Sequence, residues 1–473
     1  MDDGDKLIKR IKYMNEVGLT ILGGLWILSG SCTGHREKNE VQKQPNIVFL
    51  LADDLRWNSL NCMGNNILHT ENIDELARNG VRFTHACVTT SISMVSRASI
   101  LTGQYMSRHK IREFGKSLSE QAFTDTYPSI LRQAGYWTGF VGKYGVGQIR
   151  ESDFDFAREY ESVHWFPLVN GDSVHVTERN AKDALEFLKK RPKDKPFLLS
   201  VSFFATHAQD NHPDQYRYQP SSEKYYQNDF IPVPETTSDE YFNRLPPFIA
   251  NEANEGRVRW HWRFDTPEKY QKYMKAYYRM LTEMDLAIGR IVAELKEQGV
   301  YENTLIIFTG DNGYFHSEHG LADKWYSYEE ALRVPLVVYD PRLKQGRRNR
   351  VIDDFVLNID IAPTIISAAG SDIPGIMQGM DFSELYLLKN TKKWRKDFYY
   401  EHPFVTSETR IPSSEALVTH TSKYIFWPHY QYEEYFDLEK DPMEKNNLIN
   451  QRGAEGKIDE MKSRFDKLKS RAQ

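Results

Sequence analysis

Cysteine, net basic charge and long hydrophobic runs are all scarce in this sequence. The chain of 473 residues has three Cys, too few for a disulfide framework, so we expect Cys62 and Cys87 to be buried free thiols. A formal net charge of -5 gives no overall attraction to nucleic acid, and no nucleic-acid partner is expected. The N-terminal apolar run, residues 17–28, is short for a membrane span.

That N-terminal run is instead typical of the core of an export signal. Basic residues precede it, and small residues lead from it to Cys32, which resembles a bacterial lipoprotein signal. We therefore expect residues 1–32 to be a signal peptide and the charged residues 33–44 to be a tether. Two alternatives stay open: a lipid anchor on Cys32, which would be the chain's only contact with a membrane, or simple secretion. Both predict export to the periplasm or cell envelope.

Apolar runs that alternate with amphipathic segments indicate the fold class. With 40% hydrophobic residues the chain can bury a large core. Runs that are apolar on both faces suit central strands of a parallel sheet, and the alternation predicts an α/β fold: a large, mostly parallel sheet flanked by helices. The expected strands are 46–54, 81–88, a strand into Gly142 and Lys143, 196–207, the run 304–313 and a buried strand within 318–340; the expected helices are 71–80, 127–133, 178–190, 270–291 and 358–370.

Two regions depart from this alternation. Residues 210–266 lack periodicity and are rich in Pro, Tyr, Asn and Arg, which is typical of a lid or binding loop. After about residue 380 the segments become alternating and aromatic, and the chain closes with a polar helix. We therefore expect a catalytic domain over residues 45–380 and a smaller subdomain, an antiparallel sheet plus a helix, over residues 381–473.

Oxygen ligands follow two of the expected strands. Asp53 and Asp54 end the first run, and Asp311 and Asn312 end the run that begins at residue 304. Ligand groups in open α/β sheets gather at the carboxyl ends of the strands. A site made only of oxygen atoms suits Ca²⁺, or Mg²⁺ with more water retained, and disfavours zinc. Either pair alone would be read as a turn or a cap.

One hydroxyl and several basic groups are candidates for the chemistry around such a cation. Ser93 stands at the start of a short amphipathic run, and Arg97 follows one helical turn later. Lys143, His207 and Lys324 stand at or near strand ends. Basic side chains face a divalent cation usefully only when an anionic group lies between them, which points to phosphoryl or sulfuryl transfer. The plainer alternatives are a helix cap at Ser93, surface lysines and a core histidine.

The combination of motifs resembles the type I sulfatases of the alkaline phosphatase superfamily, from about residue 45 to the end of the chain. The similar segments are NIVFLLADD, the run Ser93-Met94-Val95-Ser96-Arg97 that ends at Leu101-Thr102-Gly103, GYWTGFVGK, the strand ending at His207, TGDNG, HGLADKWYSYEEALRVP and YFDLEKDPMEKNNL.

The resemblance implies a serine-type enzyme in which Ser93 is converted to formylglycine by an anaerobic radical maturation enzyme. The hydrate would attack sulfur, the sugar alcohol would leave, and the second hydroxyl would expel sulfate. Cys87 lacks the Ser-Arg that must follow the modified residue. The implied roles are calcium binding by Asp53, Asp54, Asp311 and Asn312 with residue 93, stabilisation of the hydrate by Arg97, binding of sulfate by Lys143 and Lys324, and protonation of the leaving oxygen by His207.

The sequence departs from the family pattern at two positions. Val95 stands where the maturation motif has Pro or Ala, and Gly145 stands where many members carry a His that would deprotonate the hydrate. His316 and His319 are candidates for assisting groups only.

The expected function is hydrolysis of sulfate esters on a carbohydrate. The family habit and an aromatic, basic insertion favour a sugar, although its arginines suit a solvated loop equally well; the insertion residues are Arg257, Arg259, Trp260, Trp262 and Arg263. One alternative is a phosphate or phosphonate ester hydrolase that keeps Ser93 unmodified. The other is an inactive lipoprotein that binds sulfated glycans.

Overall fold

The computed structural model describes residues 44–210, 212–387 and 393–473. The expected signal peptide, the lipid site at Cys32 and the tether up to residue 43 lie outside the described residues. Within them, no helix is both long enough and apolar enough to cross a membrane. Cys62 and Cys87 are free, with Cys87 buried and Cys62 half-buried.

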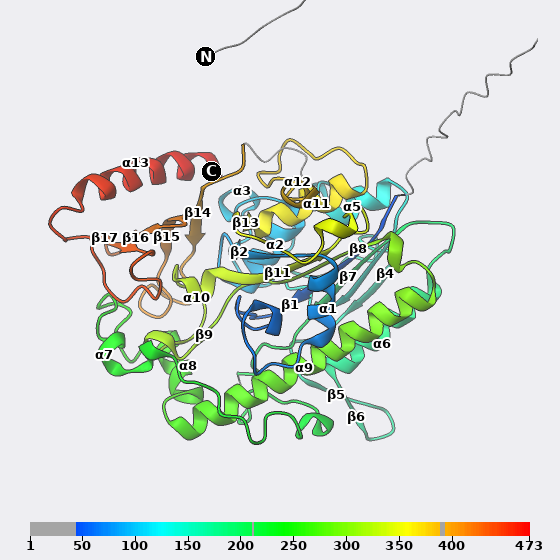
Figure 1. Ribbon diagram of the computed structural model, residues 1–473, viewed down its shortest axis with the longest axis horizontal. Coiled ribbons are helices and arrows are strands. Elements are labelled where there is room, and N and C mark those ends of the chain that lie inside the picture. Colours follow the sequence, from blue (N-terminus) through cyan, green and yellow to red (C-terminus); the bar gives the residue numbers. More distant parts are fainter. Residues whose placement is uncertain (1–43, 211, 388–392) are drawn as a thin grey trace, which may run out of the picture. The chain divides into compact units, whose positions relative to one another are not determined.

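A nine-stranded sheet forms the centre of the fold (Figure 1). Its strand order is β12-β2-β11-β8-β1-β7-β3-β4, and β13 pairs with β2. Of these strands only β11 runs antiparallel to its neighbours, β2 and β8, so the prediction of a mostly parallel sheet is confirmed. The strands are β1 (Asn46–Ala52), β2 (Val81–Cys87), β3 (Trp137–Gly142), β4 (Phe156–Glu159), β7 (Phe197–Phe203), β8 (Thr304–Gly310), β11 (Arg333–Tyr339), β12 (Arg350–Ile352) and β13 (Val356–Leu357). Two short hairpins lie outside the sheet: β5 (Trp165–Pro167) with β6 (Ser173–His175), and β9 (Phe315–His316) with β10 (Ala322–Asp323).

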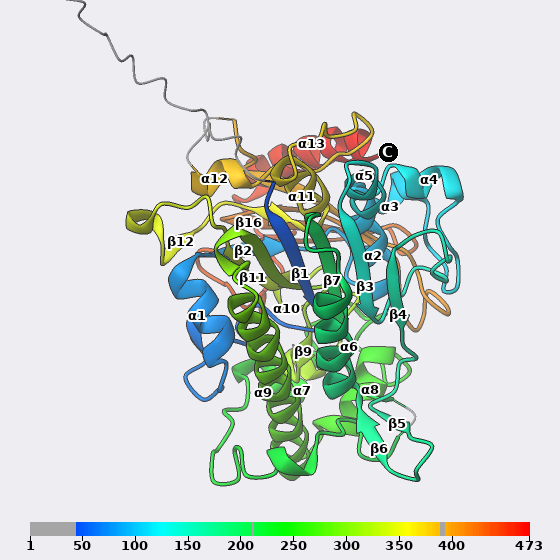
Figure 2. The ribbon, with the colours of Figure 1, turned by 90° about the vertical axis from the view of Figure 1, so that its right-hand side faces the viewer.

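Helices cover both faces of the sheet, as Figure 2 shows with the sheet between them. Successive side chains of a strand point to opposite faces of the sheet. In β1, Ile47 and Phe49 therefore pack in the core on one face, and Val48 and Leu50 pack in the core on the other face. Both cores exclude water from β1, which explains why that strand reads as one continuous apolar run. The helices are α1 (Glu71–Asn79), α2 (Ser93–Thr102), α3 (Met106–His109), α4 (Glu120–Thr124), α5 (Tyr127–Gln133), α6 (Val176–Lys190), α7 (Asp239–Phe242), α8 (Glu255–Arg263), α9 (Pro267–Glu297), α10 (Glu329–Leu332), α11 (Ile361–Ala368), α12 (Ser383–Leu387) and α13 (Glu455–Ala472).

Helix α9 is the longest helix of the described residues, and its start follows from local chemistry. Thr266 caps it by accepting a hydrogen bond from the backbone N–H of Lys269 at 3.2 Å, and Pro267 takes the first turn, where no backbone donor is needed. The predicted stripe of Met and aromatic residues, including Tyr277 and Met280, is buried in the core.

The segment 210–266 corrects the sequence analysis, because it is not an irregular loop. It contains α7, α8 and two short 3-10 turns, Pro220–Ser222 and Glu235–Thr237. Trp260 is buried and Arg263 is fully buried, so neither forms a solvated loop or an open platform for a sugar ring. The pattern was missed because α8 buries charged residues through ion pairs rather than an apolar stripe.

A second sheet forms the C-terminal part, as predicted. Its antiparallel strands are β14 (Asp397–His402), β15 (Ser414–Thr419), β16 (Ser422–Trp427) and β17 (Tyr432–Asp437), and α13 packs on it. Lys423 of β16 is fully buried and pairs with Glu329 of α10 at 2.9 Å and with Glu444 at 2.7 Å. Breaking one partner of such a buried pair is costly, so this contact fixes α10 against the second sheet.

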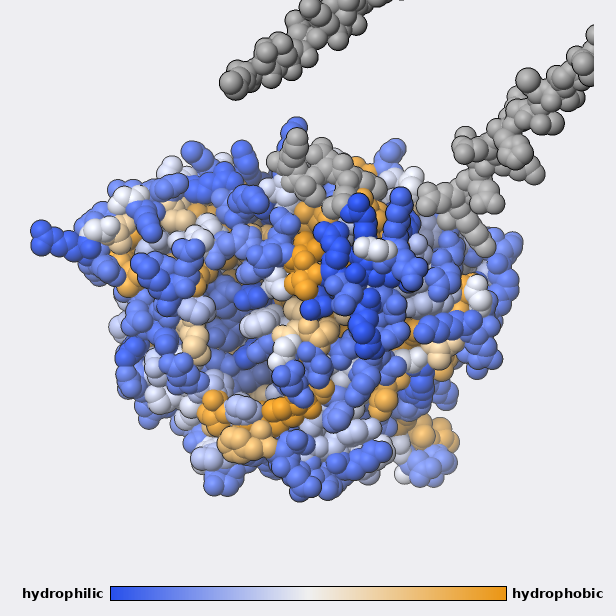
Figure 3. Space-filling view, viewed as in Figure 1, coloured by the Kyte–Doolittle hydropathy of each residue, from blue (hydrophilic) through white to orange (hydrophobic). Residues whose placement is uncertain are grey.

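The surface seen in Figure 3 is mostly hydrophilic, with hydrophobic groups gathered in small patches. Small exposed apolar patches of this kind are normal for a folded domain.

Replacing Gly142 by Ala should destabilise the fold and displace Lys143. Gly142 has φ +112°, and a Cβ there would lie 2.0 Å from the carbonyl oxygen of Ser202. We expect the free energy of unfolding to fall by about 3 kcal/mol or more, through backbone strain and overlap together.

Gly135→Ala is the matched control, because Gly135 has φ +92° and no atom of the described residues lies within 4 Å of where its methyl group would stand. It should cost only the backbone strain, about 1 kcal/mol. Denaturant unfolding measures both variants, and equal losses would contradict the close approach at Gly142.

Candidate active site

The two predicted pairs of oxygen ligands meet because β1 and β8 are neighbours. The strands are parallel and in register, with Ala52 opposite Gly310, so Asp53 and Asp54 follow one strand where Asp311 and Asn312 follow the other. The Asp54 N–H donates to Asp311 Oδ1 at 3.1 Å, and Asn312 Nδ2 donates to Asp54 Oδ1 at 2.7 Å. All four side chains are buried.

Ser93 is the first residue of α2 and its hydroxyl faces this cluster. Ser93 Oγ lies 2.9 Å from Asp53 Oδ1 and 3.2 Å from Asn312 Oδ1. The helix-cap alternative is wrong: Ile92 holds the cap position, and its side chain makes no capping hydrogen bond. The hydroxyl is therefore free of a backbone-capping role.

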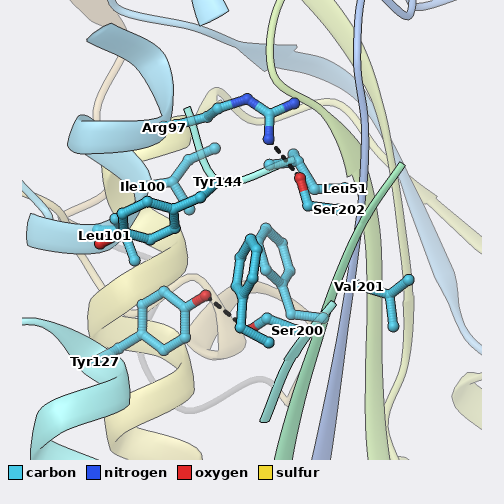
Figure 4. Close-up of a pocket in the computed structure, with 11 residues that line it drawn as sticks. Leu51, Arg97, Ile100, Leu101, Tyr127, Tyr144, Ser200, Val201 and Ser202 are labelled. Carbon is cyan, nitrogen blue, oxygen red and sulfur yellow. Dashed lines mark hydrogen bonds between the residues drawn. The ribbon is translucent and has the colours of Figure 1, made fainter. Parts of the chain in front are cut away.

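Arg97 lies one turn further along α2 and binds three parts of the chain. Its Nε donates to Asp311 Oδ2 at 2.8 Å, and its Nη1 donates to the carbonyl of Lys143 at 2.6 Å and to Ser202 Oγ, a contact drawn in Figure 4. Its Nη2 lies 3.5 Å from Asp53 Oδ2. Below it, Tyr127, Tyr144 and Ser200 line a small cavity between α2 and the sheet (Figure 4).

The two predicted lysines also reach the carboxylates. Lys143 follows β3 and donates to Asp53 Oδ2, while Lys324 follows β10 and donates to Asp54 Oδ1. Their side chains are 15% and 6% exposed, so the surface-lysine alternative is wrong for both. Burial acts to lower the pKa of Lys324, but the charge of Asp54 and the neighbouring carboxylates outweighs it and raises that pKa above its usual range.

His207 lies beyond the end of β7, on the far side of Asp54. Its Nε2 is 3.4 Å from Asp54 Oδ2, its Nδ1 is 2.5 Å from the carbonyl oxygen of Ala208, and its ring stacks on Phe204. Burial lowers the pKa of His207, and the charge of Asp54 opposes that shift only in part. The ring thus lies between the carboxylate cluster and the core residue Phe204.

The cluster is balanced in formal charge. Its ionic members are the carboxylates of Asp53, Asp54 and Asp311, and the cations of Arg97, Lys143 and Lys324. Burial acts to raise the pKa of Asp53, but Lys143 and the other cations outweigh it and hold that pKa well below its usual range. Burial, with the charge of Asp53, raises the pKa of Asp311 to about 7. One more positive group would therefore be favourable beside Asp311.

These residues fit a hard divalent cation. Asp54 Oδ2 is buried and has no hydrogen-bond donor among the described residues, although His207 stands 3.4 Å away. Carboxylate oxygens of Asp53 and Asp54 and a ring nitrogen of His207 all lie within 4.8 Å of one another, so an acidic candidate metal site exists. Oxygen donors of this number are what Ca²⁺ and Mg²⁺ prefer.

An ion-pair network beside Lys324 was missed in the sequence. Asp323 is held by Arg259 at 2.7 Å and by Arg263 at 3.0 Å, and both arginines also pair with Asp210. Asp323 has φ +76° and Asp54 has φ +56°, a strained backbone that clusters at functional sites. The only signal in the sequence was the carboxylate directly before Lys324.

Hydroxyl groups that hold the first pair of carboxylates were also missed. Thr206 Oγ1 lies 3.1 Å from the carbonyl oxygens of both Asp53 and Asp54, and the Tyr277 hydroxyl donates to the Asp54 carbonyl at 3.1 Å. Tyr277 belongs to the stripe read as core packing, and nothing in its spacing marked its hydroxyl.

The remaining predicted positions lie around the cluster. Val95 is buried in the core, and a Cβ on Gly145 would lie 2.9 Å from Arg97 Cδ. His316 and His319 are buried among aromatic rings, near Tyr277 and Tyr328. No hydrogen bond or ion pair within the described part of the chain joins either histidine to the carboxylates.

Comparison with known proteins identifies the family of this chain. The family model described as Sulfatase matches residues 45–371, and the one described as N-sulphoglucosamine sulphohydrolase, C-terminal, matches residues 317–471. The chain is 27% identical to the N-acetylglucosamine-6-O-sulfatase of Bacteroides thetaiotaomicron, over 93% of this chain and 88% of that protein. It is 28% identical to the arylsulfatase of Clostridium perfringens, over 88% of this chain and 92% of that protein.

Solved structures share the fold. BT4656, determined in complex with its substrate D-glucosamine-2-N,6-O-disulfate, superposes with a TM-score of 0.76 at 24% identity, over 91% of this chain and 98% of that one. The large central sheet, the second antiparallel sheet and the family match over more than half of the sequence lead to one conclusion: the chain belongs to the sulfatase family and is a sulfuric ester hydrolase.

Proposed function

We propose that this sulfatase removes sulfate from a carbohydrate, with a formylglycine derived from Ser93 as nucleophile and Ca²⁺ as the bound cation. One observation carries the proposal: the Ser93 hydroxyl is buried against Asp53 and Asn312, at the point where two distant strands and three cations converge. Among the described residues, the Ser93 hydroxyl forms hydrogen bonds only with the proposed cation ligands Asp53 and Asn312, which is the position that a nucleophile beside the cation requires.

The nucleophile is proposed to be modified. Formylglycine at residue 93 supplies, as its hydrate, one hydroxyl for attack on sulfur and a second one for release of sulfate. Arg97, whose Nε is fixed by Asp311 at 2.8 Å, keeps a positive charge one turn away from residue 93 and favours the deprotonated oxygen there. The modification requires the radical maturation enzyme as a partner, and Val95 stands inside the sequence that this enzyme would recognise.

The proposed ligands of the cation are Asp53, Asp54, Asp311 and Asn312, with the oxygen of residue 93. Calcium is favoured over magnesium because four protein residues already offer oxygen atoms, whereas Mg²⁺ keeps several of its waters. The cation supplies charge that stabilises the attacking and ester oxygens when it is bound.

The basic side chains then act on the substrate. Since the cluster is already neutral, a divalent cation leaves a surplus of two positive charges. The anionic sulfate ester balances one of them, and the deprotonated hydroxyl of the residue-93 hydrate balances the other. Lys143 and Lys324 are proposed to turn from Asp53 and Asp54 to the sulfate oxygens. His207 is proposed to protonate the leaving oxygen, and an anionic ester beside the ring favours its protonated form.

A carbohydrate is the proposed substrate because of what the relatives act on. The Bacteroides relative is an N-acetylglucosamine-6-O-sulfatase, and the similar structure holds a disulfated glucosamine. Among the aromatic residues of the insertion, Trp262 is 40% exposed and Arg259 and Arg263 lie near its ring. Trp262 is therefore accessible to a sugar, whereas Trp260 is buried.

Export is proposed from the N-terminal sequence alone. If Cys32 carries a lipid, the lipid would hold the exported enzyme at the cell envelope. The division into a catalytic domain, residues 45–380, and a subdomain, residues 381–473, is likewise a proposal.

Conversion of Ser93 is the first prediction. In protein produced anaerobically together with a maturation enzyme, the peptide that contains residue 93 should be lighter than the encoded peptide by two hydrogen atoms, as measured by mass spectrometry. Ser93→Ala should lower sulfatase turnover at least about 10³-fold. Ser99→Ala, a buried serine of the same helix, should keep most of the turnover.

An unconverted serine in every molecule would contradict the formylglycine mechanism. Turnover of phosphate or phosphonate esters by that protein would then favour the hydrolase alternative. Binding of sulfated sugars without release of sulfate, by matured protein and across a broad panel, would favour the binding lipoprotein.

Calcium dependence is the second prediction. Ca²⁺ should stabilise the wild-type protein by about 2.7 kcal/mol at a concentration one hundred times its Kd. The double variant Asp311→Ala, Asn312→Ala should lose this stabilisation, because it removes two proposed ligands. The control Asp285→Asn changes a buried carboxylate that binds Asn72 and Ile73 of α1, so the calcium response should persist. A thermal unfolding series with calcium and with chelator measures both, and an unchanged response in the double variant refutes the site.

Leaving-group dependence is the third prediction. His207→Ala should lower kcat for a sulfated sugar by about 10²-fold or more, because the sugar alkoxide needs a proton to leave. An aryl sulfate, whose phenolate leaves readily, should be affected much less. His69→Ala, an exposed histidine, serves as control. Equal losses on both substrates would argue against general acid catalysis by His207.

A further inference from the structure

A second cluster of possible metal ligands lies apart from the active site. His85 belongs to β2 of the central sheet, Asp353 follows β12, and His420 stands in the turn between β15 and β16 of the second sheet. His85 Nδ1 is 2.8 Å from Asp353 Oδ1, and the two imidazole rings are 4.6 Å apart between centroids. One nitrogen of each ring and a carboxylate oxygen all lie within 4.8 Å of one another.

Neighbouring side chains hold these three groups in place. Phe355 stacks on the His420 ring with centroids 4.0 Å apart and meets the His85 ring edge-on at 5.5 Å. Thr84 Oγ1 donates to Asp353 Oδ1 at 2.5 Å. These contacts restrict the orientation of the two rings and of the carboxylate, as the surroundings of a metal site do.

The electrostatic surroundings are compatible with a cation. Arg333 acts on His85 as a neighbouring positive charge, but its guanidinium is already bound to the Thr84 carbonyl oxygen at 2.5 Å and to Glu329 at 3.4 Å. Lys396 lies near His420 and acts against a cation, whereas Asp353 and Asp354 act in its favour.

We propose that His85, Asp353 and His420 form a zinc site that links the central sheet to the second sheet. Two imidazoles and one carboxylate are a ligand set that suits Zn²⁺, with water in the fourth position, and differ from the all-oxygen set at Asp53 and Asp54. The ion would tie the β15–β16 turn to β2. The site is separate from the sulfatase chemistry, since no hydrogen bond or ion pair within the described ranges connects it to the carboxylate cluster.

The test is zinc binding to untagged, full-length protein saturated with CaCl₂, which keeps the all-oxygen site filled. Titration calorimetry with ZnCl₂ should show one ion per chain, and a hundred-fold excess over the Kd should raise the Tm by about 2–5 °C. His420→Ala should weaken binding at least about tenfold, because it removes one ligand while the His85–Asp353 pair remains. His85→Gln should do the same.

The matched control is His429→Ala, which removes an exposed histidine from the neighbouring turn of the same sheet and should leave zinc binding unchanged. Asp311→Ala should also keep one zinc ion per chain, so this test does not depend on the proposed catalytic mechanism. Absence of saturable binding, or equal binding by wild type and His420→Ala, would overturn the proposal and leave an ion pair only.

Discussion

Three carboxylates buried at the ends of neighbouring strands can stay charged only if cations reach them from elsewhere in the chain. An isolated buried carboxylate takes up a proton instead, because the low-polarity interior disfavours its charge. Here Arg97, Lys143 and Lys324 provide the balance, from α2, from the end of β3 and from beyond β10. The fold can be understood as the arrangement that brings these three basic groups to one edge of the sheet.

Helix α8 and the second sheet, both outside the central sheet, hold the segment around Lys324 in position. The α8 arginines keep Asp323, and with it the backbone before Lys324, against the insertion. Lys423 of the second sheet holds Glu329, five residues after Lys324, from the opposite side. Ion pairs at Asp323 and at Glu329 thus fix the loop that carries Lys324 on both sides of that lysine. Their partners, in α8 and in β16, are distant from this loop in the sequence.

The neutral cluster also explains how one site can bind both a divalent cation and an anion. In the proposed mechanism, each lysine that pairs with a carboxylate would be exchanged for the cation and would then be available for a sulfate oxygen. This gives the basic side chains two successive partners without any change in the fold. It also couples binding of the ester to binding of the cation, since either alone leaves the site charged.

Much of the fold was readable in the sequence because its physical signals are local. Continuous apolar runs marked β1, β7, β8 and β11, since both faces of a central strand are covered. The helix α8 within the segment 210–266 was not predicted, because α8 is buried through ion pairs. Ion pairs with distant residues produce no periodic hydrophobic pattern in the sequence of the helix itself. The Thr206 and Tyr277 hydroxyls were missed for a similar reason. In the sequence, a buried Thr or Tyr that only packs in the core cannot be distinguished from one whose hydroxyl also contacts the backbone of Asp53 or Asp54.

The sequence by itself determined the chemical inventory: four oxygen ligands after two apolar runs, one hydroxyl at a helix start, and basic groups near other strand ends. Only the tertiary structure decided that these groups meet, because the register of β1 on β8 and the crossing of α2 are set by packing over the whole sheet. It also decided that Ser93 faces the carboxylates rather than capping α2, and that the arginines of α8 support Asp323 instead of facing solvent. A side chain's direction depends on contacts between distant segments, and no local pattern contains them.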